Sequence, residues 1–81
     1  MKRTLTEAVA IALTTARKNA NISQEELAHR SGLDRTYISG IERGVRNITL
    51  NSLERVVNGL KIEMSVFLLE IIDELTIQDT K

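Results

Sequence analysis

Polar side chains recur at helical spacing in the stretch LDRTYISGIERG, residues 33–44. At about 100° per residue, one arc of this stretch carries two guanidiniums, two hydroxyls and one position without a side chain, namely Arg35, Thr36, Ser39, Gly40 and Arg43. A guanidinium can fork onto the O6 and N7 atoms of guanine, and hydroxyls can bond bases or phosphates. The missing side chain at Gly40 costs helix stability, which favours a close approach at this position. The arc therefore predicts contact with a large anionic partner, double-stranded DNA.

Tyr37, Arg46 and Asn47 flank this arc. Tyr37 lies at its edge, and two interpretations stay open: the ring packs into the core, or the hydroxyl reaches a phosphate. Arg43, Arg46 and Asn47 follow the helix and are expected to contact phosphates or flanking bases, which positions a protein on DNA more than it specifies sequence. The alternative for the arc as a whole is an ordinary solvated helix face.

The charge of the chain is balanced overall but not along its length. The 81 residues include 11 basic and 11 acidic side chains, a balance that by itself argues against a nucleic-acid partner. Residues 1–61 hold ten Lys or Arg against six Asp or Glu, whereas residues 62–81 hold five acids and one base. This asymmetry predicts one basic working surface and an acidic end turned away from it.

The composition argues against disulfides, a metal site, catalysis and a membrane-spanning helix. The chain has no Cys, and His29 is its only His, so we expect neither disulfides nor a metal site. Neither a nucleophile paired with a base nor a Gly-rich phosphate loop is recognisable, which predicts a protein that is not an enzyme and has no cofactor or small-molecule ligand. Apolar runs stay short of the roughly 18 residues of a spanning helix, so we expect a cytoplasmic protein that does not contact membranes.

The lack of Pro and the three-to-four spacing of aliphatic residues predict an all-α domain of five helices. The first begins near Thr4 or Thr6, with a capping box formed by Thr4 and Glu7, and ends around residues 19–21. The other predicted caps and breaks are Ser23, Gly32, Asp34, Gly44, Thr49, Gly59 and Ser65. Residues 31–34 form the turn between two short helices, which defines a helix-turn-helix. We expect one compact domain over residues 1–75, with a dimerisation helix at about 65–75 and a frayed tail at 76–81.

The segment VFLLEIIDEL, residues 66–75, is apolar over a wider arc than one small core can cover. The excess predicts a dimer interface that includes Phe67, Ile71 and Leu75, since a symmetric pair is the commonest way to bury such a stripe. A groove for another protein is the second interpretation. Membrane attachment is the weakest, because the acidic residues of this segment would be repelled by anionic lipid.

The stretch SQEELAHRSGLDRTYISGIERGVRNITLNSLERVVNGL, residues 23–60, resembles the helix-turn-helix family of phage-repressor-like (XRE-type) regulators. Within that family it looks most like the controller proteins of restriction–modification systems, although many general members have Pro in place of Ile48. The resemblance implies a repressor-like DNA-binding fold and a homodimer that binds a two-fold symmetric operator. It also implies regulation of transcription, often of the protein's own gene together with an endonuclease gene, with RNA polymerase as a further partner.

The resemblance also assigns roles to three residues outside the arc. It implies that Gln24, in the first turn of a helix whose backbone N–H groups are free, bonds a phosphate. It further implies that Arg17 pairs with Glu42 and locks the third helix onto the first. A Glu42 carboxylate in contact with DNA would instead be repulsive.

Two functions from different classes remain open at this stage. The first is a sequence-specific transcriptional regulator that binds DNA as a homodimer through Arg35, Thr36 and Ser39. The second is an antitoxin-like interaction module that masks a partner protein through its last helix. The first is favoured because a module that binds only protein would not need Arg35, Arg43 and Arg46 on one face.

Overall fold

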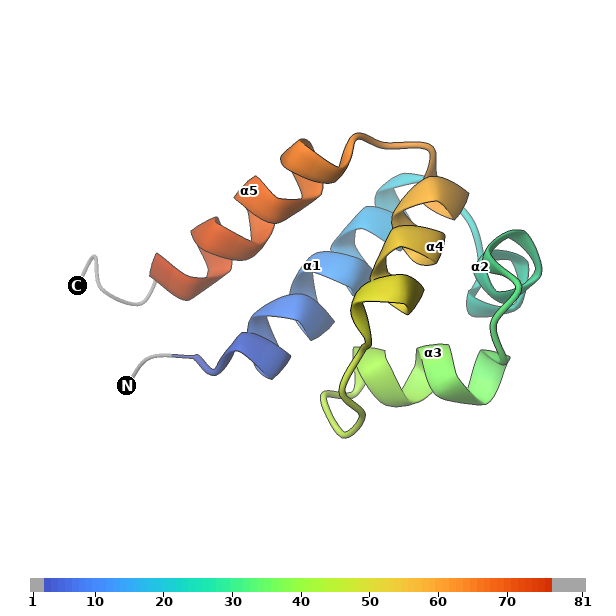
Figure 1. Cartoon of the computed structure of the whole chain (residues 1–81), viewed down its shortest axis with the longest axis horizontal. Helices are drawn as coiled ribbons and strands as arrows, with labels where there is room; N and C mark the ends of the chain where they lie inside the picture. Colours follow the sequence, from blue (N-terminus) through green and yellow to red (C-terminus); the bar gives the residue numbers. More distant parts are fainter. Residues whose placement is uncertain (1–2, 77–81) are drawn as a thin grey trace.

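Five α-helices make up the part of the chain that the structure, a computed structural model, describes, residues 3–76 (Figure 1). They are α1 (Leu5–Asn19), α2 (Gln24–Ser31), α3 (Arg35–Glu42), α4 (Leu50–Leu60) and α5 (Met64–Thr76). The described residues contain no strand, so the predicted all-α class with five helices is confirmed. The predicted frayed tail lies outside the described residues except for Thr76, which is the last residue of α5.

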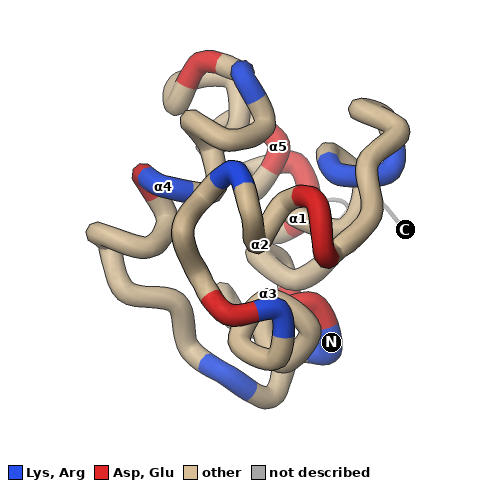
Figure 2. Tube along the Cα trace, turned by 90° about the vertical axis from the view of Figure 1, so that its right-hand side faces the viewer, with Lys and Arg blue, Asp and Glu red and all other residues tan. Residues whose placement is uncertain are grey.

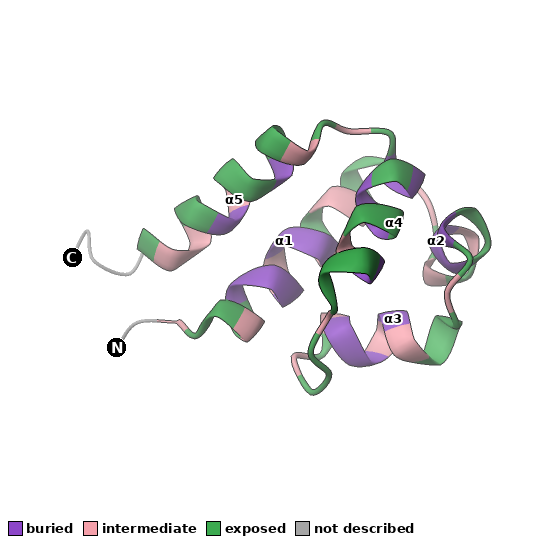
Figure 3. Cartoon of the chain, in the orientation of Figure 1, coloured by how far each residue is buried: buried purple, intermediate pink, exposed green. Residues whose placement is uncertain are grey.

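The helices pack around one core. α1 packs against α3 and α5, while α2 packs against α3 and α4. In Figure 1, α5 lies alongside α1 and runs in the opposite direction. Figure 3 shows buried residues on all five helices. The largest fully buried side chains are Leu13, Leu27, Ile38, Ile41, Val56, Val57 and Phe67. Each such burial stabilises the fold by about 1.5–3 kcal/mol.

Two helix starts follow the predicted capping chemistry. The Thr4 hydroxyl accepts a bond of 3.1 Å from the Glu7 N–H, and the Glu7 carboxylate accepts one of 2.9 Å from the Thr4 N–H, which completes a capping box. The Thr49 hydroxyl likewise accepts from the Ser52 N–H at 3.0 Å at the start of α4. These caps satisfy backbone donors that no turn of the helix can reach.

The other three predicted starts need correction. Ser23 caps α2 through the Glu26 N–H, as predicted, but the Glu26 carboxylate bonds Arg30 one turn on, so the capping box that the Ser23–Glu26 spacing also predicts is only half formed. Asp34 occupies the N-cap position of α3 with extended backbone, yet its side chain makes no cap hydrogen bond within the described residues. Helix α5 begins at Met64, so Ser65 lies inside its first turn and does not cap it.

The turn between α2 and α3 consists of residues 32–34, because Ser31 still belongs to α2. Gly32 closes α2 with φ at +72°, a left-handed backbone that glycine adopts without strain. Helix α4 ends at Leu60, one residue after the predicted break at Gly59, so Gly59 lies inside the last turn and does not stop the helix at its own position. Gly59 instead lets α4 approach α2: a Cβ there would lie 3.3 Å from atoms of both Leu27 and Arg30.

Candidate nucleic-acid interface

Helix α3 is divided lengthwise into a buried side and an exposed side. Ile38 and Ile41 are 0% and 1% exposed, whereas Arg35 and Thr36 are exposed in the first turn and Ser39 is half-buried. The core side formed by Ile38 and Ile41 therefore lies opposite Arg35 and Thr36, as helical spacing predicts. In helix-turn-helix proteins of known binding mode, the first turn of the second helix is the part that contacts base edges. In this chain that turn carries the exposed Arg35 and Thr36, whose contact with bases stays a prediction.

Gly40 does not lie on the exposed arc, contrary to the sequence interpretation. The residue is buried, and the loop of residues 43–49, which follows α3, folds back over it. The N–H groups of Val45 and Arg46 both donate to the Gly40 carbonyl, at 3.0 and 3.2 Å. The group that approaches Gly40 closely is therefore the chain's own loop and not a partner molecule. The physical reason is that the loop returns across α3 at this position.

Arg43 and Arg46 hold different places in this loop. Arg43 is exposed at the C-terminal end of α3, where its Nε donates to the Ser39 carbonyl at 3.4 Å. The guanidinium carbon of Arg46 lies 5.2 Å from the centre of the Tyr37 ring, within range of a cation–π contact. Gly44, with φ at +76°, provides the left-handed bend between the two arginines.

Tyr37 packs against the core and also joins the loop by its hydroxyl. The hydroxyl donates to the Asn47 carbonyl at 3.3 Å and accepts from the Thr49 N–H at 3.3 Å. Burial by itself raises the pKa of Tyr37, but donors at Ser52 and Thr49 and the charge of Arg46 outweigh it, so the pKa lies below its ordinary value. The ring and the hydroxyl of Tyr37 therefore brace the loop, and contact with a phosphate remains a prediction.

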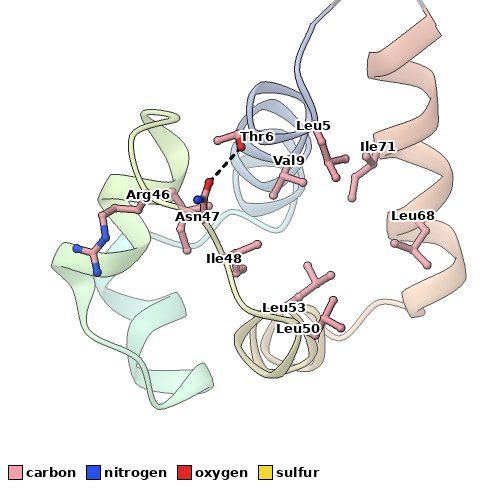
Figure 4. A pocket seen from close by; sticks show the side chains of 11 residues that line it. Leu5, Thr6, Val9, Arg46, Asn47, Ile48, Leu50, Leu53, Leu68 and Ile71 are labelled. Atoms are coloured by element: carbon pink, nitrogen blue, oxygen red, sulfur yellow. Dashed lines mark hydrogen bonds between the residues drawn. The ribbon is translucent and has the colours of Figure 1, made fainter.

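Asn47 is exposed, but its side chain is tied to α1. The Thr6 hydroxyl donates to the Asn47 Oδ1 at 3.2 Å (Figure 4). Asn47 is expected among the DNA contacts, and its bond to Thr6 is an additional, structural role. No local pattern signals it, because the two residues are far apart in the chain and meet only when the loop folds onto α1.

The ion pair implied by the family resemblance is present in the structure. Arg17 Nε and Nη2 donate to the two carboxylate oxygens of Glu42 at 2.7 and 3.1 Å, and Arg17 Nη1 donates to the Ile22 carbonyl at 2.9 Å. The two side chains are 12% and 6% exposed. The pair joins the last turn of α1 to the last turn of α3.

Gln24 completes this cluster. Its Nε2 donates to Glu42 Oε1 at 2.9 Å, so the residue expected to bond a phosphate also fixes the end of α3. Burial raises the pKa of Glu42, but hydrogen bonds from Arg17 and Gln24 and the charge of Arg17 outweigh it and lower the pKa below its ordinary value. The hydrogen bond to Glu42 in turn raises the pKa of Arg17 against the effect of burial.

The end of the molecule formed by α2 and α3 carries charges of both signs. Figure 2 looks at this end and shows basic stretches of the trace alternating with acidic ones. The basic working surface predicted from the sequence is therefore a set of individual arginines beside acidic positions.

The predicted dimer residues of α5 require a correction. Phe67 and Ile71 are 0% and 5% exposed and belong to the core of their own chain, so Phe67 offers no surface to a partner subunit and Ile71 offers only its edge in a groove beside α1 and α4. Leu75 is half-buried. The exposed residues of α5 lie between the core positions, because each step along a helix turns the side chain by about 100°. The large apolar side chains left exposed on α5 are Val66, Leu68, Leu69 and Ile72.

An open apolar groove lies between α1, α4, α5 and the 43–49 loop, and Leu68 is one of the residues that line it (Figure 4). The groove has a volume of about 400 Å³, and its lining includes Leu5, Ile48, Leu50, Leu53, Leu68 and Ile71. Leu5 and Leu50 at its edges are 62% and 82% exposed, which is unusual for large aliphatic residues. Aliphatic spacing predicts both on the buried sides of their helices, which is wrong, because each falls next to a capping Thr, where a helix end leaves side chains open to solvent.

Within residues 3–76, no helix is long and apolar enough to cross a membrane. The same residues bring together no group of three acidic or His side chains that could hold a metal ion. His29 is exposed on α2.

A helix-turn-helix with an exposed polar second helix defines a class of DNA-binding protein, and comparison with known proteins places the chain in it. Residues 13–67 match the family model described as Helix-turn-helix, so the chain belongs to this family. It is also 48% identical over 44 residues to the control protein C.BamHI of Bacillus amyloliquefaciens and 45% identical over 49 residues to C.MunI of a Mycoplasma species. These matches cover 54% and 60% of this chain.

Solved structures extend the likeness to nearly the whole chain. The wild-type restriction–modification controller protein C.Esp1396I is 42% identical, with a TM-score of 0.85 over 90% of this chain and 96% of that one. C.Esp1396I has also been solved bound to a 25 base-pair operator site and as a tetramer with its natural 35 base-pair operator. Within the helix-turn-helix family, the chain is thus of the restriction–modification controller type. The matches span about half of C.BamHI and two thirds of C.MunI, 54% and 66% of their lengths.

Proposed function

We propose that this protein is a sequence-specific regulator of transcription that binds double-stranded DNA as a homodimer and serves as the controller of a restriction–modification system. The exposure of Arg35 and Thr36 on the first turn of α3 carries the proposal. These side chains offer one guanidinium and one hydroxyl at the position from which a helix-turn-helix reads the major groove. As part of the proposal, the protein acts in the cytoplasm, and RNA polymerase is a second partner.

Contacts to the DNA backbone fall to the residues around α3. Arg43 at the end of α3 and Arg46 over Tyr37 are exposed and positively charged, which suits phosphates on either side of the groove. Gln24 has a second amide hydrogen besides the one it donates to Glu42. We assign these three residues to positioning the protein on the duplex.

We assign the homodimer interface to the exposed apolar side chains Leu5, Leu50 and Leu68, which line the groove, together with Ile72 on α5. All four side chains are at least 43% exposed in the single chain. Burying them against a second copy would remove apolar surface from water, at about 25 cal/mol for each Å². A two-fold symmetric pair would also present two α3 helices to two half-sites of an operator.

Selection of bound sequences from a random DNA pool by the purified protein tests this function. We expect enrichment of a site with two inverted half-sites, bound by two copies or a multiple of two. The same selection with Arg35→Ala/Thr36→Ala is the control, and it should lose the preference while keeping weak binding. A wild-type protein that enriches no sequence, but binds one neighbouring gene product tightly, would overturn the proposal in favour of a protein-masking module.

A further inference from the structure

Gly40 faces the 43–49 loop rather than a partner, and the group that occupies the space beside it is the stem of Arg46. A Cβ added at Gly40 would overlap the Cγ of Arg46 and would lie 3.3 Å from its Cβ and 3.6 Å from its Cδ. Three consecutive carbons of one arginine therefore run past the glycine. The guanidinium beyond them lies over the Tyr37 ring, one helical turn earlier on α3.

We propose that Gly40 is a positioning residue for Arg46: the missing side chain lets the arginine lie across α3 and holds its guanidinium at the edge of the DNA-binding face. This inference rests on the proposed function, because it takes Arg46 as a DNA contact. Gly40 and Arg46 thus act together, because the space left by Gly40 determines where the guanidinium of Arg46 lies.

The overlap with Cγ cannot be relieved at the flexible end of the arginine. The position of Cγ is set by the first side-chain torsion alone, so any relief needs either a different rotamer or a shift of the loop backbone. A backbone shift is opposed by the two N–H groups, of Val45 and Arg46, that donate to the Gly40 carbonyl. Rotation of the side chain is the remaining response, and it removes the guanidinium from Tyr37.

Holding the guanidinium in place favours binding. A free arginine loses much of its rotamer freedom when it contacts DNA, and this loss lowers affinity. An arginine already fixed by Gly40 and Tyr37 loses less. This accounts for a glycine in the interior of α3, where alanine would be the better helix former.

Four proteins test the inference: the wild type, Gly40→Ala, Arg46→Ala and the double variant. Each is titrated by fluorescence anisotropy against the duplex selected by the wild type and against a scrambled duplex, at several salt concentrations. Thermal unfolding is followed on the same samples. Gly59→Ala serves as the matched control, because Gly59 is also a buried helix glycine, but its neighbours are Leu27 and Arg30 on α2.

We expect Gly40→Ala to weaken binding about tenfold, the loss typical of one charged contact, and to reduce the salt slope by about one unit. Arg46→Ala should do the same. In the Arg46→Ala background, Gly40→Ala should change neither affinity nor slope, and it should lower the melting temperature less than in the wild type, because the overlapping Cγ is gone and only the Cβ of residue 46, at 3.3 Å, remains close. Gly59→Ala should alter the melting temperature and leave the salt slope unchanged.

Gly40→Ala with wild-type affinity and slope would overturn the inference, as would an equal loss with and without Arg46. If Gly40→Ala does not fold while the double variant does, the overlap with Arg46 is supported. If neither folds, the inference is wrong. If the wild type prefers no DNA sequence, the proposed function is wrong, but the coupling between residues 40 and 46 is still tested. The melting temperatures of the four proteins measure that coupling without DNA.

Discussion

Arg17 holds Glu42 through two parallel hydrogen bonds of 2.7 and 3.1 Å, and this contact fastens the C-terminal turn of α3 to that of α1. A bidentate guanidinium–carboxylate pair fixes orientation as well as distance. The exposed first turn of α3 can therefore face DNA while the other end of the helix is anchored. Glu42 also accepts from Gln24, so α1, α2 and α3 meet at one carboxylate.

Removing the arginine should destabilise the fold strongly. Arg17→Ala leaves the Glu42 carboxylate mostly buried without its main partner, and we expect a loss of about 3 kcal/mol in the free energy of unfolding, measured with urea. Glu26→Gln, which breaks the exposed pair with Arg30 on α2, is the control and should cost under about 1 kcal/mol. Equal effects of the two substitutions would show that the Arg17–Glu42 pair is not a structural lock.

Stability should depend on pH through Glu42. Because its pKa in the folded protein is lowered, the pair contributes its full stabilisation above the unfolded value of about 4.3, and loses it as pH falls through the lower folded value. Urea midpoints measured from pH 7 to about 3 should therefore fall more steeply for the wild type than for Glu42→Gln. Parallel curves for the two proteins would contradict the assigned shift.

Substitutions on α5 should separate the core from the dimer surface. Ile72→Asp changes a residue that is 51% exposed, so we expect a folded, monomeric protein with much weaker DNA binding. Ile71→Asp puts a charge into the core and should unfold the chain. Val66→Asp, on the other exposed side of α5, is the control and should stay dimeric. Sedimentation velocity measures all three, and an Ile72→Asp variant that stays dimeric at micromolar concentration excludes this surface.

Arg35 and Arg43 should differ in what they contribute to binding. Arg35→Ala should cost about 1–3 kcal/mol on the selected site and relax the preference at one position per half-site, with little effect on scrambled DNA. Arg43→Ala should weaken both duplexes and reduce the salt slope by about one unit for each lost phosphate contact. If Arg35→Ala weakens both duplexes equally, Arg35 only holds phosphate, and specificity comes from Thr36, Ser39 or DNA shape.

Local chemistry made much of the fold predictable. The caps at Thr4 and Thr49, the left-handed Gly32 and the exposure of Arg35 and Thr36 opposite Ile38 and Ile41 follow from neighbouring residues, and these are as the sequence predicts. Asn21, with φ at +60°, likewise closes α1 near the predicted position. Such features depend on interactions within a few residues, which the sequence displays directly.

Long-range packing limited the prediction of the site. Helix α5 is apolar on so many sides that its sequence does not reveal which side faces the core, and the packing of Phe67 onto the other helices decides it. The burial of Gly40 escapes the sequence for a similar reason: its neighbour Arg46 reaches it only because the loop folds back. The DNA contacts and the dimer surface remain predictions.

The segment from Val45 to Leu50 has a consequence for anyone who redesigns this protein. At one end, the N–H groups of Val45 and Arg46 donate hydrogen bonds to the Gly40 carbonyl on α3. At the other end, Ile48 and Leu50 line the apolar groove. Substitutions at Arg35 and Thr36 change only solvent-facing groups and leave the rest of the molecule intact. A library for new target sequences should therefore vary those positions freely and keep residues 45–50 constant, because a change in this segment alters two surfaces at once.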